Sequence, residues 1–252
     1  MVNMHNKIVA IMIAYNESKF IDCALQSVID HVDGMIVIEG AFKEFIALGK
    51  SPRSTDGTIE IIENFIKRHQ DKNIIYRQAN EKSDLEQRNV ALSLALDMNP
   101  THILIYDADE VYCDYHWRAI KQIAQTTIDV FVFTCMTFVQ DYQHYCWQQF
   151  PRLFRVRDKS MKFVNDNYVA FNDAAWQQLN KHVLDLRYFH YAFCKGRERF
   201  EDKKKWWETR FNKPFHYDWQ YDADSQQIKP DNHTIYKFVG KHPIQIRNKF
   251  GL

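Results

Sequence analysis

The sequence contains 252 residues, enough for one α/β domain with a full hydrophobic core or for one domain with a small appendage. Its formal net charge is only +1, so its overall charge does not favour nucleic acid or an anionic membrane as a partner. There is no N-terminal signal and no apolar run long enough to cross a membrane, and the five cysteines lack CxxC or zinc-ligand spacing. We therefore expect a cytoplasmic protein without a transmembrane segment, disulfides or a nucleic-acid partner, and leave peripheral membrane contact open.

The first half of the chain alternates between predicted strands and helices. Strands are expected at residues 7–13, 35–38, 73–77 and 103–106, and helices at about 20–28, 58–66 and 83–99, with a loop or short helix at 41–53. This alternation predicts an α/β fold with a mostly parallel central sheet flanked by helices. Ligands bind such sheets at the carboxyl ends of the strands, so Tyr15, Glu39 and Asp107 are expected to line one edge.

The pattern changes in the second half of the chain. Strands are expected at 129–139, 152–156 and 184–193, helices at 115–125, 172–179 and 197–210, and a polar and aromatic loop at 140–149. Residues 213–252 show little periodicity and are expected to form an irregular C-terminal extension. We therefore expect a single catalytic domain at 1–212, followed by this extension.

Two aspartates follow the last strand of the first half. The apolar run 103–106 leads into Asp107 and Asp109, with only Ala108 between them. In an extended chain these two side chains share a face, and like charges held about 4 Å apart repel by roughly 4 kcal/mol at an effective dielectric of 20. A divalent cation with oxygen ligands is the simplest neutralising partner, and an acidic turn after a buried strand is the alternative.

Several of these segments together resemble a known family. Over residues 7–112 the sequence resembles the family 2 glycosyltransferases of the GT-A fold. The resemblance rests on AYNE after the first strand, an acid at the end of the second, and then STDGT, QRNVAL and DADE in that order. PRLFR and YFHY continue the resemblance more loosely, towards bacterial enzymes that decorate surface glycans. The resemblance implies a hexosyltransferase that uses a nucleotide-sugar, foremost a UDP-sugar, with a carbohydrate or lipid-linked glycan as acceptor. Residues 1–112 would bind the donor and residues 113–212 the acceptor.

The resemblance also implies roles for individual residues. The nucleotide-sugar would contact Ala14, Tyr15, Asn16, Glu17, Glu39, Asp56, Arg88, Asp107 and Ala108. Asp107 and Asp109 match the family's DXD pair, so they would hold Mn²⁺ or Mg²⁺, with Asp109 the more direct ligand. The sequence departs from the family pattern at the second strand. In the family this strand ends in two or three acids followed at once by a serine turn, whereas here it ends in Glu39-Gly40 and about a dozen extra residues, 41–53, precede the turn.

The expected chemistry asks for further side chains. Cleavage of a sugar–diphosphate bond builds charge on the leaving phosphate, which a metal at Asp109 together with Arg88 would stabilise. An inverting enzyme also needs a carboxylate base, for which Asp166 is the candidate and Asp173 and Asp185 are rivals. His190 is either a ligand of the metal or diphosphate, or a hydrogen-bonded core residue.

Two other functions fit part of the same sequence. Residues 107–111 fit the DxDx[TV] core of aspartate-nucleophile phosphatases, although these enzymes carry it after their first strand. A non-catalytic glycan-binding module would account for the aromatics without needing the aspartate pair. A phosphate loop at 49–51 fails because Glu44 replaces the required glycine, and an EF-hand fails because Tyr112 replaces another.

Overall fold

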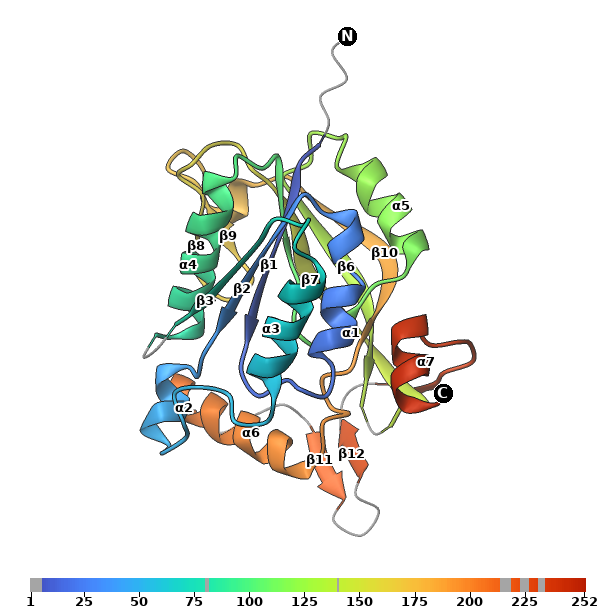
Figure 1. Ribbon diagram of the computed structural model, residues 1–252. Coiled ribbons are helices and arrows are strands. Elements are labelled where there is room, and N and C mark those ends of the chain that lie inside the picture. The colour runs from blue at the N-terminus through green and yellow to red at the C-terminus, as the bar shows by residue number, and fades with distance from the viewer. Residues whose placement is uncertain (1–5, 80–81, 140, 214–218, 223–226, 231–233) are drawn as a thin grey trace.

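The molecule is built on one curled β-sheet with helices on both faces (Figure 1). The computed structural model describes residues 6–79, 82–139, 141–213, 219–222, 227–230 and 234–252. The sheet order is β3-β2-β1-β4-β7-β6-β10-β5, with β13 paired to β7. Its strands are β1 (Ile8–Ala14), β2 (Gly34–Glu39), β3 (Ile74–Gln78), β4 (His102–Ile105), β5 (Glu110–Val111), β6 (Val130–Phe138), β7 (His144–Arg155), β10 (Lys181–His190) and β13 (Tyr236–Lys237).

The first four strands, β1 to β4, run parallel to one another. β1 pairs with both β2 and β4, and β2 pairs with β3. All seven residues of β1 are apolar and almost all are buried, as expected for a central parallel strand covered on both faces. The carboxyl ends of these strands therefore meet at one edge, which positions the AYNE loop beside Asp107.

Helices cover the two faces of this sheet and confirm the predicted α/β fold. The helices are α1 (Ile21–Gln26), α2 (Lys43–Ala47), α3 (Thr58–Arg68), α4 (Asp84–Asp97), α5 (Asp114–Ile123), α6 (Arg197–Phe211) and α7 (Ile244–Phe250), with 3₁₀ turns at Ile29–His31 and Trp176–Gln178. Apolar residues of α1, α3 and α5 pack on one face, and those of α4 on the other. At the start of α4, Ser83 and Glu86 form the expected capping box.

The expected loop at 140–149 is wrong for most of its length. β7 begins at His144 and runs antiparallel to β6, with partners from Tyr145↔Phe138 to Phe154↔Val130. Polar side chains suggested a loop, but this strand keeps one face partly solvated while residues such as Cys146 face the core. Main-chain pairing with β6 therefore decides the structure, and composition does not.

The C-terminal part of the chain contains short regular elements where an irregular extension was expected. Within residues 213–252, β11 (Trp219–Asp222) pairs antiparallel with β12 (Gln227–Pro230). Earlier in the chain, β8 (Lys162–Phe163) pairs antiparallel with β9 (Val169–Ala170) in another two-stranded sheet. Helix α7 packs near α1 through the fully buried Ile246.

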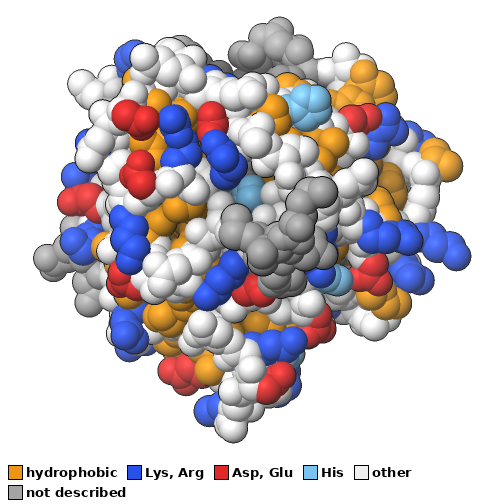
Figure 2. Space-filling model, turned by 90° about the horizontal axis from the view of Figure 1, so that it is seen from above, with side chains coloured by type: hydrophobic (Ala, Val, Ile, Leu, Met, Phe, Trp, Pro, Cys, Tyr) orange, Lys and Arg blue, Asp and Glu red, His pale blue; other side chains and the backbone are white. Residues whose placement is uncertain are grey.

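Two further observations concern the whole described molecule. None of its helices is both long and apolar enough to span a bilayer, and all five cysteines are free thiols. Seen from above, on the side away from α2 and α6, lysine and arginine side chains are interspersed with aspartate and glutamate (Figure 2).

Candidate active site

A cleft of about 270 Å³ lies at the carboxyl ends of the parallel strands, where α2 and α6 lie side by side (Figure 1). Its wall combines aromatic side chains with both acids and bases. The charged residues that line it are Glu17, Asp84, Arg88, Asp107, Asp109, Arg152, Asp166, His190, Lys195, Arg199 and Lys203. The predicted aspartate pair therefore faces a cleft.

Two guanidinium groups hold Asp107. Arg152 Nη2 donates to Asp107 Oδ2 at 2.8 Å, and Arg88 Nη2 donates to Asp107 Oδ1 at 3.3 Å. Burial raises the pKa of Asp107, but Arg152 and Arg88 outweigh it and lower the pKa to about 2. Asp107 is therefore an anion with both oxygens already engaged.

Two other cations hold Asp109, whose side chain is 7% exposed. Lys195 Nζ lies 2.7 Å from Asp109 Oδ2, and His190 Nε2 lies 3.4 Å from Asp109 Oδ1. Burial lowers the pKa of His190, but the Asp109 carboxylate outweighs it and raises the pKa to about 10. Lys195 also lies 2.5 Å from Glu17 Oε2, so one ammonium group joins the AYNE loop to Asp109.

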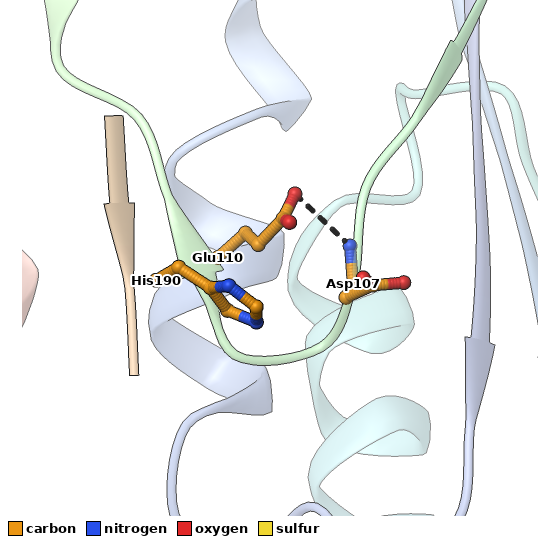
Figure 3. A group of neighbouring side chains, drawn as sticks. All are labelled: Asp107, Glu110 and His190. Atoms are coloured by element: carbon orange, nitrogen blue, oxygen red, sulfur yellow. Dashed lines mark hydrogen bonds between the residues drawn. The ribbon is translucent and has the colours of Figure 1, made fainter. Parts of the chain in front are cut away.

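Glu110 forms a buried anchor behind this pair. Arg152 donates to Glu110 Oε1 from Nε at 3.1 Å and from Nη2 at 2.5 Å, and the Tyr188 hydroxyl donates to the same oxygen at 3.1 Å. Glu110 Oε2 accepts the backbone N–H of Asp107, the contact drawn as a dashed line in Figure 3. Glu110 therefore fixes both the loop that carries Asp107 and the guanidinium that neutralises it.

The donor set suits a hard divalent cation by its chemistry. Ligand atoms of Asp107, Glu110 and His190, drawn in Figure 3, all lie within 4.8 Å of one another, and oxygen and imidazole ligands suit Mn²⁺ or Mg²⁺. However, each of the four carboxylate oxygens of Asp107 and Asp109 already lies against a cationic side chain. A cation shared by the two aspartates therefore requires at least one of these side chains, such as Lys195, to give way.

The AYNE loop is held by the STDGT turn. The backbone N–H groups of Asn16 and Glu17 donate to the side-chain oxygens of Ser54 and Thr58 at 2.8 and 2.7 Å, and Asn16 adopts the left-handed conformation (φ 52°). Asp56 Oδ2 accepts the N–H of Ser18 at 3.0 Å, and its Oδ1 accepts from Thr58. These two sequence motifs therefore bind each other, and the STDGT turn supports the loop from which Tyr15 and Glu17 line the cleft.

The structure brings together some of the predicted site residues. Tyr15, Glu17, Arg88, Asp107, Ala108, Asp109, Asp166 and His190 line the cleft, whereas Ala14, Asn16, Glu39 and Asp56 are outside its lining. Glu39 is fully buried, and its Oε1 accepts the backbone N–H of Ser54 at 2.8 Å, so it anchors the end of the 41–53 segment. Among the candidate bases, Asp173 and Asp185 are exposed and paired with arginines away from the cleft.

Sequence reasoning missed several charged residues of the cleft. Arg152 and Glu110 bind each other across 42 residues of chain, and Lys195 binds Glu17 across a much longer separation. The only sequence signal was local: Arg152 opens RLFR, and Lys195 opens the basic run KGRER after a long apolar strand. Neither signal identifies a partner.

A charged cleft at the carboxyl edge of a parallel sheet is the usual ligand site of an α/β protein. The model of glycosyl transferase family 2 matches residues 9–187, most of the chain, and the chain therefore belongs to that family. The similarity to solved structures is distant. TarS of S. aureus is 15% identical with a TM-score of 0.50, the match covering 83% of this chain and 44% of that one.

A second similar structure is the mannosyltransferase PcManGT from Pyrobaculum calidifontis in complex with GDP-Man and Mn²⁺. It is 14% identical with a TM-score of 0.51, and the match covers 84% of this chain and 66% of that one. At such identities these likenesses show a shared fold. None of the curated proteins compared with the chain matches it. The family resemblance seen in the sequence is thus confirmed.

Proposed function

We propose that this protein transfers a hexosyl group from a nucleotide-sugar, foremost a UDP-sugar, to a hydroxyl group of a carbohydrate or lipid-linked glycan. The observation that carries the proposal is the pairing of Asp107 and Asp109 with Arg88, Arg152 and Lys195 in one cleft at the edge of a family 2 sheet. Such a cleft offers hydrogen-bond donors to a diphosphate and carboxylates to a cation or a sugar hydroxyl.

The cationic residues would stabilise the nucleoside diphosphate as it leaves the sugar. As the sugar–oxygen bond breaks, negative charge builds on the leaving phosphate, and fixed guanidinium groups near it lower the barrier without reorganising. Arg152 is 1% exposed and is held by Glu110, so its position is set before the donor arrives. Arg88 approaches Asp107 from α4, on its other oxygen.

We propose a divalent cation, Mn²⁺ or Mg²⁺, for Asp107 and Asp109, with Glu110 and His190 close by. Such an ion supplies charge neutralisation to the bound diphosphate. PcManGT, whose fold this chain shares, is described with GDP-Man and Mn²⁺, which supports testing that pair of ligands here. In this chain Lys195 would move from Asp109 towards Glu17 or the donor when the cation binds.

We propose Asp166 as the base that accepts the proton of the acceptor hydroxyl, with inversion at the anomeric carbon. Asp166 lines the cleft, and Arg210 Nη2 lies 2.6 Å from its Oδ1. Burial raises the pKa of Asp166, against the opposing influence of Arg88, and a raised pKa makes a carboxylate a better proton acceptor. Its rivals lie outside the cleft lining.

A phosphatase and a non-catalytic glycan-binding module have less support. Membership of a glycosyltransferase family argues against a phosphatase, and both oxygens of Asp107 are engaged by arginines, which leaves neither free as a nucleophile. A non-catalytic glycan-binding module would not need this buried charge network.

The test is a screen of nucleotide-sugars with the purified protein. UDP-, GDP-, dTDP- and CMP-sugars are incubated with Mn²⁺ or Mg²⁺, and release of free nucleotide is followed. We expect hydrolysis of one nucleotide class, lost in Asp109→Asn. Release of phosphate from simple phosphomonoesters, with no nucleotide-sugar cleaved, would support the phosphatase and contradict the proposal.

A further inference from the structure

The charges of the cleft balance except at one residue. Every carboxylate of its lining lies within ion-pair distance of a lysine, arginine or histidine: Glu17, Asp84, Asp107, Asp109 and Asp166. Lys203 lines the same cleft, yet no carboxylate of the described residues pairs with it. Within the described part of the chain, this ammonium group therefore has no anion of its own.

The surroundings of Lys203 make this arrangement costly. Its Nζ lies 5.0 Å from the centroid of the Phe193 ring, which offers a weak cation–π contact in place of a carboxylate. Burial and the nearby ammonium of Lys195 lower the pKa of Lys203. Lys203 is partly buried, and an ammonium group that has lost part of its hydration without gaining an anion lowers stability, so an anionic ligand would remove that cost.

Two further donors of the cleft also lack partners among the described residues. Arg152 Nη1 and Arg88 Nε are buried and make no hydrogen bond there, although both arginines line the cleft. Among the described residues, α4, β7 and α6 therefore each place in the cleft a cationic side chain with a donor that has no acceptor. A ligand with several anionic oxygens matches this set better than a neutral sugar does.

Helix α6 is fixed so that Lys203 faces the cleft. Arg199 Nη2 donates to the Tyr15 carbonyl at 2.6 Å and to Glu17 Oε1 at 3.0 Å, near the start of the helix. Arg210, near its end, pairs with Asp84 and Asp166. Lys203 is four residues after Arg199 and seven before Arg210, so all three lie on one helical face.

We propose that Lys203 binds the diphosphate of the nucleotide-sugar and stays with it as the leaving group. This inference rests on the proposed function and adds a substrate-binding residue from a helix outside the stretch 9–187 that the family model matches. The ammonium group provides a third cationic contact beside Arg88 and Arg152. No bond to Lys203 forms or breaks, since its role is electrostatic.

Calorimetry with nucleoside diphosphates tests the assignment. For the diphosphate that binds best among UDP, GDP, ADP, CDP and dTDP, we expect Lys203→Met to weaken binding at least tenfold and Lys203→Arg to retain most of it. Affinity for the corresponding nucleoside, which has no phosphate, should change less than twofold. Lys205→Met, an exposed position on the same helix, is the matched control and should bind like wild type.

A second readout separates ligand binding from a structural role. Lys203 has no carboxylate partner to lose among the residues that the structure describes, so Lys203→Met without ligand should unfold at the same or a higher urea concentration than wild type. A clear loss of stability, or diphosphate affinity equal to wild type, would overturn the inference and leave the proposed function standing. Failure of wild type to bind any of the five diphosphates would overturn both.

Discussion

Replacing Lys195 by methionine probes how the acids of the cleft are kept charged. Lys195 Nζ bridges Glu17 and Asp109, and the side chains of the three residues are only 7–13% exposed. Burial lowers the pKa of Lys195, but Asp109 and Glu17 outweigh it and raise the pKa, so the ammonium stays charged. Lys195→Met keeps most of the side-chain volume and removes the charge.

The expected loss of stability follows from this burial. Removing one partner of a buried ion pair typically costs about 3–5 kcal/mol, because the remaining charge is left in a poorly solvated site. Arg199 still contacts Glu17 and His190 still contacts Asp109, so we expect the lower end, about 3 kcal/mol. Urea denaturation at neutral pH without divalent cations measures this change, with Lys205→Met as the matched control.

Manganese should then restore part of the loss. A ligand present at a hundred times its Kd stabilises a protein by about 2.7 kcal/mol, and in the variant no ammonium competes for Asp109. We therefore expect Mn²⁺ to bind Lys195→Met more tightly than wild type and to stabilise it more at the same concentration. A variant as stable as wild type, or one that gains no more from Mn²⁺ than wild type does, would refute this reasoning.

Three other predictions follow from the same contacts. Asp109→Asn should reduce sugar transfer at least 100-fold, and unchanged turnover would contradict the assigned role. Because Lys195 and His190 lose their anion, urea titration should also show a free energy of unfolding lower by about 3 kcal/mol. Asp166→Asn should lower kcat by roughly 10²–10⁴ without weakening diphosphate binding, whereas Asp173→Asn should change neither; equal kcat values for the two variants exclude Asp166 as the base. Burial lowers the pKa of His116 to about 3, whereas its pKa in the unfolded chain is about 6.5. As the pH falls below 6.5 the unfolded state takes up the proton first, so the free energy of unfolding should fall by roughly 1.4 kcal/mol per pH unit. His116→Asn should give a shallower decline in urea midpoints, and an identical decline argues against this source.

The sequence predicts best where a pattern is local. The continuous apolar run of β1 and the Ser83 capping box each determine their structure within a few residues, and both occur as expected. β7 was partly missed because its polar residues are tolerated on a half-solvated strand, whose existence depends on pairing with β6. Local composition does not contain that pairing.

In the candidate site, too, local features could be predicted from the sequence and long-range contacts could not. The position of Asp107 and Asp109 at the carboxyl edge followed from the alternation of strands and helices, and the structure places both in the cleft. Their partners did not follow, because Arg152 and Lys195 come from distant segments that only the folded chain brings together. Charge repulsion predicted that something positive lies beside the two acids, and the structure shows that side chains already do so.

The central claim is that this cleft binds a nucleoside diphosphate through a cation held by the aspartate pair. The most direct measurement is titration of the wild type and of Asp109→Asn with UDP and GDP, each with Mn²⁺ and with EDTA. We expect the wild type to bind one nucleotide far more tightly when Mn²⁺ is present, and Asp109→Asn to lose that enhancement. Equal affinity in all four combinations of protein and metal would contradict the claim.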